Sequence, residues 1–175
     1  MIIKGKNVVL RAIEREDAEL LRGMMNDPQI ESMMWGYSFP VSKQGQEAWM
    51  SNLGNEKNVF RAIIEVDGVG IGQVILSDID MKNGNAEIHI KLADSNVRGK
   101  GYGTDAVETI TKYAFEELRL NCVFCRVRVD NTPSRKVFEK CGYQEEGILR
   151  SRVYREGKYH DFVEYSILKS DMESI

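Results

Sequence analysis

Two turn signals constrain the fold of this chain more than any other feature. Asp67-Gly68 separates strand-like runs at residues 59–66 and 70–76, and Asn83-Gly84 precedes a third run at residues 85–92. Asp-Gly and Asn-Gly are preferred in two-residue hairpin turns, because both central residues of such a turn adopt positive φ. We therefore predict three consecutive strands paired as an antiparallel meander.

The third run alternates between apolar and polar residues. Ile88, Ile90 and Leu92 occupy every second position, which in a strand places them on one face of the sheet. The positions between them hold polar residues that must face the other way: Glu87, His89 and Lys91. This strand is therefore expected to present one face to the core and one polar face to a site or to solvent.

The rest of the chain continues this mixture of helical and strand-like patterns. Apolar periodicity and terminating residues predict helices at residues 16–25, 42–53, 104–118 and 132–141. Runs rich in β-branched residues predict further strands at residues 7–13, 121–129, 146–154 and 159–168. The fold class expected is a single α+β domain over residues 1–175, with a mostly antiparallel central sheet and flanking helices.

Composition excludes several classes of protein. The chain has 175 residues, of which 42% are apolar, so it suits one folded domain and not a disordered segment. Its net charge is −3, whereas a nucleic-acid-binding domain usually carries an excess of basic residues. Lys4 and Lys6 interrupt the start before a signal peptide's apolar region, and no run approaches the ~18 apolar residues of a membrane span. We expect a cytoplasmic protein with neither nucleic acid nor membrane as a partner.

Cys122 and Cys125 have the spacing of a zinc or redox motif. They lie within the predicted strand 121–129, where an odd separation sends the two thiols to opposite faces. No second pair of ligands follows at zinc spacing. We therefore expect ordinary cysteines and no metal.

The chemistry concentrates in a glycine-rich loop between a strand and a helix. Glycines allow a ligand to approach the backbone, and the helix N-terminus offers unpaired N–H groups with partial positive charge, a combination that binds phosphate oxygens. The loop consists of Arg98, Gly99, Lys100, Gly101, Tyr102, Gly103 and Thr104.

Three classes of phosphate-bearing ligand could bind to a loop of this kind. A nucleotide-binding P-loop fails, because Lys100 is followed by Gly101 and not by Ser or Thr. A dinucleotide fold fits the spacing Gly101-x-Gly103-x-x-Ala106, with Asp130 after the next strand. Against it, a central parallel strand should be apolar on both faces, and residues 85–92 are not. The third ligand is the pyrophosphate of an acyl-CoA.

Two motifs carry a resemblance to a known family. Arg98-x-x-Gly101-x-Gly103 matches the [QR]-x-x-G-x-[GA] pattern of the GNAT N-acetyltransferase superfamily. Residues 97–106 and 129–143 resemble the RimJ/RimL-like branch, the ribosomal-protein N-acetyltransferases, and residues 10–17 resemble that branch's opening. The resemblance covers essentially the whole chain and implies an acetyl-CoA-dependent N-acetyltransferase of GNAT fold.

The resemblance also implies where acetyl-CoA would bind. The N–H groups of residues 98–104 would hold the pyrophosphate, and strands 85–92 and 121–129 would splay apart after Leu92 to form a V-shaped slot. Pantetheine would pair with Ile90, Lys91 and Leu92 like an added strand, and the N–H of Leu92 would polarise the thioester carbonyl. The remaining expected cofactor contacts lie at the next helix: Asn131, Ser134, Arg135 and Lys136.

The reaction needs a base for the amine and can use an acid for the CoA thiolate, and each role has more than one candidate. Glu87 is the candidate general base in direct attack by the amine, and the alternative is a solvated or ion-paired Glu. His89 is a weaker candidate than an ordinary structural His. Phe138 stands where many GNAT enzymes have a Tyr that protonates the CoA thiolate, so Ser134 is the candidate substitute, ahead of Tyr143 and Tyr102. No acid is needed if the thiol leaves as a thiolate, since its pKa is ~8.5.

The amine acceptor is expected opposite CoA, against residues 26–41 and the turn at residues 154–161. Trp35, Tyr37 and Phe39 are expected to line the acceptor site or else to anchor a loop, and Glu31 or Asp27 would attract a cation. The site must come from the first ~60 residues, the C-terminal turn or a partner subunit in a homodimer, since one domain leaves no room for more. The expected acceptor is a protein N-terminus or a small amine, with a polyamine or aminoglycoside as alternative. A non-catalytic acetyl-CoA-binding module is the alternative of another class.

Overall fold

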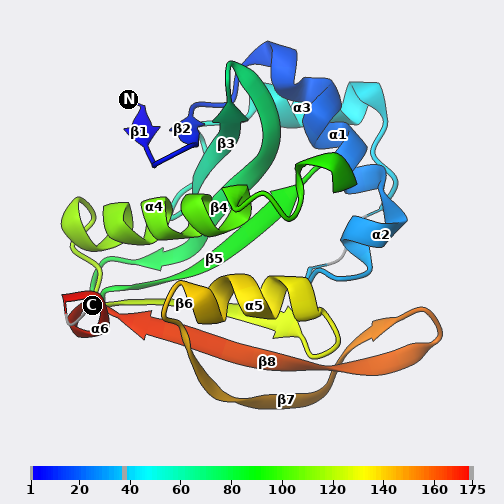
Figure 1. The fold of residues 1–175 in the computed structure, drawn as a ribbon. Helices are drawn as coiled ribbons and strands as arrows, with labels where there is room; N and C mark the ends of the chain where they lie inside the picture. Colours follow the sequence, from blue (N-terminus) through cyan, green and yellow to red (C-terminus); the bar gives the residue numbers. More distant parts are fainter. Residues whose placement is uncertain (1, 37–38, 174–175) are drawn as a thin grey trace.

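The structure, a computed structural model, describes residues 2–36 and 39–173 (Figure 1). Its α-helices are α1 (Ala18–Asn26), α2 (Pro28–Glu31), α3 (Lys43–Ser51), α4 (Tyr102–Glu116), α5 (Thr132–Lys140) and α6 (Lys169–Glu173). Two 3-10 turns, Arg15–Asp17 and Ser95–Val97, precede α1 and α4. The strands are β1 (Ile3–Lys4), β2 (Val9–Arg11), β3 (Phe60–Val66), β4 (Val69–Asp80), β5 (Asn85–Leu92), β6 (Cys122–Arg128), β7 (Gln144–Arg155) and β8 (Lys158–Leu168).

All eight strands form one sheet in the order β1-β2-β3-β4-β5-β6-β8-β7. Neighbouring strands are antiparallel except for β5 and β6, which are parallel and are connected by α4. The meander β3-β4-β5 is therefore confirmed, and Asp67 and Gly68 adopt the positive φ angles of 50° and 79° that the turn demands. The mixed, mostly antiparallel α+β fold is confirmed as well.

The pairing between β5 and β6 is short. It covers Asn85–Glu87 against Cys122–Phe124 and then stops, although β5 continues to Leu92. The prediction that the strands separate after Leu92 was wrong: they separate five residues earlier, after Glu87. Beyond that point β5 keeps its ladder with β4, and β6 keeps its ladder with β8, so each strand follows its own partner as the sheet twists.

The two faces of the sheet are covered differently. Helix α4 crosses one face, with α5 beside it, and buries the larger core; its central side chains Ala106, Val107 and Ile110 are fully buried against Ile88 and other strand residues (Figure 1). Helices α1–α3 lie toward the other face, where Leu21, Met24 and Ile30 pack on Ile63 of β3. The polar side of β5 faces this second, smaller core.

Three of the helices and strands were not expected from the sequence, and the bounds predicted for strand β4 were too short. Strand β1 and helices α2 and α6 have two, four and five residues, fewer than a periodic pattern needs to be recognised. Asp27-Pro28 does end α1, but Asp27 also caps α2 and Pro28 opens it. Strand β4 continues beyond residue 76 through an irregular register that includes Asp78 at a φ of 49°.

Asp105 joins the N-terminal segment to α4. Its buried carboxylate accepts hydrogen bonds from the backbone N–H groups of Lys6, Asn7 and Val8 at 2.9, 2.6 and 3.0 Å. We expect Asp105→Ala to lower the free energy of unfolding by roughly 3 kcal/mol, because it leaves three N–H donors unpaired, one of them buried and two part-buried. Urea titration measures the loss. The matched control is Glu108→Ala on the same helix, whose exposed ion pair with Lys6 is worth under ~1 kcal/mol; equal losses in both variants would contradict the assignment.

The two cysteines of the C-x-x-C pair are free thiols: Cys125 is buried in the core, and Cys122 is half-buried. Among the described residues there is no group of three side chains that could hold a metal ion. No helix within residues 2–36 and 39–173 is both long and apolar enough to cross a membrane.

Candidate active site

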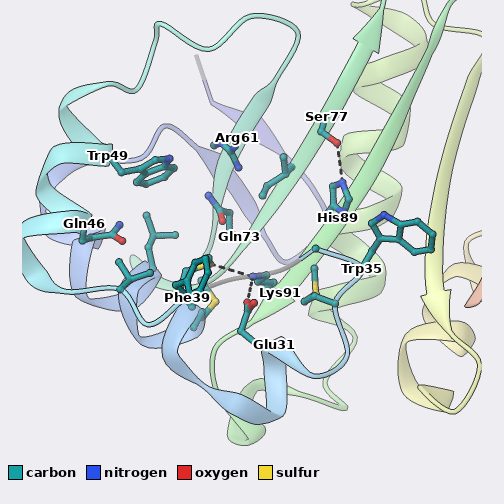
Figure 2. A pocket seen from close by; sticks show the side chains of 18 of the residues that line it. Glu31, Trp35, Phe39, Gln46, Trp49, Arg61, Gln73, Ser77, His89 and Lys91 are labelled. Atoms are coloured by element: carbon teal, nitrogen blue, oxygen red, sulfur yellow. Dashed lines mark hydrogen bonds and ion pairs between the residues drawn. The ribbon is translucent and has the colours of Figure 1, made fainter. Parts of the chain in front are cut away.

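A cavity of about 810 Å³ lies between helices α1–α3 and the polar face of strands β3–β6 (Figure 2). Its apolar side comes from Leu21, Met24 and Trp49 of the helices and from Met34 and Trp35 of the following segment. The sheet contributes the polar lining residues Arg61, Gln73, Ser77, Asp78, Glu87, His89, Lys91 and Arg126. The alternation predicted for residues 85–92 thus puts Glu87, His89 and Lys91 into one cavity.

Glu87 lies where β5 and β6 part. The residue is 3% exposed; its Oε2 is 3.5 Å from Nη1 of Arg126, and its Oε1 has no hydrogen-bond partner in the structure. Burial raises the pKa of this carboxyl to about 7, and the positive charge of Arg126 opposes part of that rise. At neutral pH Glu87 is therefore poised between its acid and base forms, as a general base requires.

His89 is a neutral neighbour of Glu87. Its Nε2 forms a 2.9 Å hydrogen bond with Oγ of Ser77 and lies 3.9 Å from Oε2 of Glu87 (Figure 2). Burial, with further help from the charge of Lys91, lowers the pKa of His89 to about 4. The ring is consequently uncharged at pH 7 and does not form an ion pair with Glu87. The hydrogen bond to Ser77 gives it a structural partner.

Lys91 turns its side chain into the cavity and pairs with Glu31. The two charged groups are 2.6 Å apart, and their side chains are 10% and 17% exposed (Figure 2). The carboxylate of Asp27 in turn accepts the N–H of Gln29 at 2.8 Å and caps α2. The structure therefore gives both acidic residues that were expected to attract a cation a partner within the chain.

Trp35 lines the cavity and is also anchored. The guanidinium carbon of Arg126 lies 4.6 Å from its ring centre, and its ring meets that of Phe162 edge to face at 5.2 Å. Phe39 lines the cavity as well but is 73% exposed. Tyr37 lies outside the described residues.

The C-terminal hairpin supports the segment that carries Trp35. Arg128 donates to the carbonyl of Ser32 at 2.9 Å and pairs with Glu156 at 3.3 Å, while Arg155 donates to the carbonyl of Gly36. The turn at residues 154–161 supplies none of the described lining residues. Its contribution to this side of the molecule is to hold residues 32–36.

Beyond Glu87, the edge of β5 that faces β6 has no strand partner. The N–H of Ala93 donates to the carbonyl of Ile71 at 2.9 Å, so in an antiparallel ladder the N–H of Leu92 must point the opposite way, toward the gap. Arg98 reaches back and donates to the carbonyl of Leu92 at 3.3 Å. Gly99 and Gly101 adopt φ angles of 74° and 84°, and α4 begins at Tyr102, two residues earlier than expected. The loop thus ends in an open helix N-terminus, with Gly103 and Thr104 in the first turn.

The residues of α5 that were expected to contact the cofactor differ in their contacts within the protein. Asn131 caps the helix by accepting the N–H of Ser134 at 3.3 Å, and Lys136 is exposed. The guanidinium of Arg135 is occupied by the hydroxyl of Tyr165, at 2.9 Å, and by the carbonyl of Val129. Of these two basic residues, Arg135 is therefore directed to the sheet, whereas the side chain of Lys136 faces solvent.

Phe138 and Tyr143 belong to the core. They are 2% and 4% exposed, and their rings meet edge to face at 5.1 Å. The hydroxyl of Tyr143 is bonded to Oγ1 of Thr111 at 2.7 Å, and burial raises its pKa well above the usual value. A buried, bonded phenol of this kind has no route to a CoA thiolate.

Several cavity residues were missed at the sequence level. Arg126 follows buried Cys125 in a strand, so the alternation of residues 121–129 was a signal that it faces the site. Gln73 likewise lies in a strand that pairs with the polar face of β5. Gln46 and Trp49 come from α3, and nothing local to their sequence shows which part of the sheet that helix will cover.

Comparison with known proteins agrees with the geometry. A family model described as an acetyltransferase (GNAT) domain matches residues 7–144. The chain is 33% identical over 170 residues to the uncharacterized N-acetyltransferase p20 of Bacillus licheniformis, covering 95% of each. It is 32% identical over 176 residues to the putative ribosomal N-acetyltransferase YdaF of Bacillus subtilis, covering 97% of this chain and 95% of the relative. The spermidine N-acetyltransferase of Vibrio cholerae, solved with CoA and spermine, superposes with a TM-score of 0.86 at 26% identity, covering 94% of this chain and 97% of the other.

Proposed function

This chain belongs to the GNAT acetyltransferase family and is an N-acetyltransferase that uses acetyl-CoA, and we propose that it transfers the acetyl group directly to a primary amine, with Glu87 as general base. The observation that carries the proposal is the placement of Glu87. Its carboxyl group lies where the cavity meets the gap between β5 and β6. This group has a pKa of about 7 and one oxygen without a hydrogen-bond partner. A base at that junction is within reach of both substrates.

The cofactor would lie in the gap. The backbone of residues 98–104 would hold the pyrophosphate at the start of α4, and the pantetheine arm would run along residues 90–92. The inferred direction of the Leu92 N–H supports its role as the donor to the thioester oxygen, which gains negative charge as the amine attacks. Asn131 and Ser134 would flank the arm from the start of α5.

The reaction then needs few groups. Glu87 takes a proton from the ammonium, and the free amine attacks the thioester carbon to form a C–N bond. The C–S bond breaks as the oxyanion collapses, and the sulfur leaves as a thiolate. The nitrogen, which the new C–N bond makes acidic, loses its second proton to that thiolate or to solvent. Because the pKa of a thiol is ~8.5, protonation by the protein is not essential, which agrees with Phe138 standing where a Tyr was expected. Ser134 remains the candidate acid if one is used.

The acceptor we propose is the amino terminus of a protein or a small primary amine. The described residues that line the cavity combine apolar groups with three acidic and three basic side chains: Glu31, Asp78, Glu87, Arg61, Lys91 and Arg126. This balance suits an amine that carries a mixed polar and apolar body. It gives no particular advantage to a polycation.

A thiol-release assay with acetyl-CoA and a panel of primary amines tests the proposal. We expect kcat/KM for a good acceptor to rise with pH and to level off above an apparent pKa of about 7, because only the deprotonated form of Glu87 accepts the proton. The assay records free thiol from pH 5.5 to 9 at subsaturating amine. Measurable acetyl-CoA binding without thiol release for any amine would instead indicate a binding module.

A further inference from the structure

Two glutamines in the cavity lack partners. Gln46 of α3 is 4% exposed and Gln73 of β4 is 7% exposed, and the amide nitrogen of each is buried without a hydrogen bond in the structure. Figure 2 shows both amide ends directed into the same part of the cavity, beside Trp49 and Arg61. A buried amide without a partner is unfavourable, so two of them at one end of an open cavity point to a ligand that completes them.

The register of the sheet sets the distance of this end from Glu87. Gln73 is opposite Lys91, and Ser77 is opposite Glu87, so the two ends of the cavity are four residues apart along β4 and β5. At ~3.3 Å per residue this separation is about 13 Å. An acceptor whose amine lies at Glu87 must be extended to reach the glutamines.

The charges near the glutamines select the chemistry of the far group. Lys91 lies opposite Gln73 on β5, and Arg61 lies on β3 two residues from Ile63, the residue opposite Gln73. The two cations are paired with Glu31 and Glu56. The other two acidic residues among the described lining side chains, Asp78 and Glu87, lie at the opposite end of the cavity. A second ammonium would therefore meet two cations whose counterions are already in use. An oxygen that accepts hydrogen bonds would meet amide N–H groups with positive charge nearby.

We propose that Gln46 and Gln73 form a distal subsite that binds a carbonyl or carboxylate oxygen of the acceptor, about 13 Å from the amine that is acetylated. The inference rests on the proposed function, because Glu87 marks the position of that amine. It makes the enzyme selective for amines with an extended, oxygen-bearing body, as in the first residues of a peptide, and selective against linear polyamines.

Four acceptors of equal length test the subsite: decylamine, 1,10-diaminodecane, 10-aminodecanoic acid and 10-aminodecanamide. They share one primary amine and differ only in the far group, which is methyl, ammonium, carboxylate or amide. We expect the better of the two oxygen-bearing acceptors to exceed the diamine at least tenfold in kcat/KM, through KM. A diamine that equals or exceeds both would overturn the proposal.

Variants locate the effect. Gln73→Leu and Gln46→Leu should each lower kcat/KM for the oxygen-bearing acceptors about tenfold relative to decylamine measured in the same variant. Gln144→Leu, at an exposed position of β7, is the matched control and should change none of the four. The Tm of the two cavity variants should equal or exceed that of the parent, since each removes a buried, unpaired amide.

The outcomes distinguish failure of the distal subsite from failure of the proposed function. Equal losses for all four acceptors in both cavity variants would show that the glutamines shape the cavity and do not select an oxygen, which would overturn the subsite. Absence of acetylation of every acceptor by the parent enzyme, with acetyl-CoA bound, would instead overturn the proposed function.

Discussion

Glu87→Gln is expected to lower kcat for a good amine acceptor by roughly 10²- to 10⁴-fold, the usual contribution of a general base. The substitution keeps the shape of the side chain but removes its capacity to accept a proton. Acetyl-CoA affinity should hardly change, because the cofactor is expected to bind through the backbone of residues 90–92 and 98–104. Steady-state kinetics at saturating acetyl-CoA and calorimetric titration of the cofactor measure the two quantities separately.

Stability gives this variant an independent control. The folded-state pKa of Glu87 is raised from 4.5 to about 7, so the folded protein holds this proton more tightly than the unfolded chain does. The contribution of Glu87 to stability is therefore greatest below pH 4.5 and is lost as the pH rises through 7, by roughly 2–3 kcal/mol. Gln does not titrate, so the variant should be more stable than the parent at pH 8 and gain little at pH 4.5.

These two readouts exclude a trivial explanation. An inactive variant with a raised Tm at pH 8 has lost its base and not its fold. Retention of full turnover would show that another group, or water alone, removes the proton, and that Glu87 is only a buried carboxyl held near Arg126.

The sequence was most informative where function depends on local backbone pattern. The alternation of residues 85–92 predicted both faces of β5, and the glycine spacing predicted the loop before α4, because strand period and left-handed turns are local properties. Asp67-Gly68 likewise predicted the β3–β4 hairpin. These features needed no knowledge of what packs against them.

The parts that could not be predicted depend on distant contacts. The position at which β5 leaves β6 is set by the ladders that each strand forms with β4 and β8, so the position implied by the family resemblance was too late. Gln46 reaches the cavity only because α3 folds back over the sheet, and the pairing of Glu31 with Lys91 joins residues 60 positions apart. Such contacts build the lining of the cavity, which is why this lining could not be predicted from local sequence.

Gly101→Val is expected to weaken acetyl-CoA binding by roughly 10- to 100-fold, as measured by calorimetric titration. Gly101 adopts a φ of 84° at the start of α4, a conformation in which a β-branched residue costs roughly 1–3 kcal/mol. A Cβ at this position meets no protein atom within 4 Å, so it would project into open space beside the helix N-terminus. Relief of the strain moves the N–H groups that should hold the pyrophosphate, and the new side chain competes for the same space.

Gly68→Val separates this local effect from general destabilisation. Gly68 adopts a φ of 79° in the β3–β4 turn, and a Cβ there also meets nothing within 4 Å, so the backbone strain is matched. Both variants should lose similar stability in urea, but only the change at Gly101 should alter cofactor affinity. Equal affinity losses would attribute the effect to the fold as a whole, whereas unaltered affinity in Gly101→Val would remove the loop from the cofactor site. Because a valine would be strained alike at both positions, the difference between the two variants measures what the loop contributes to binding.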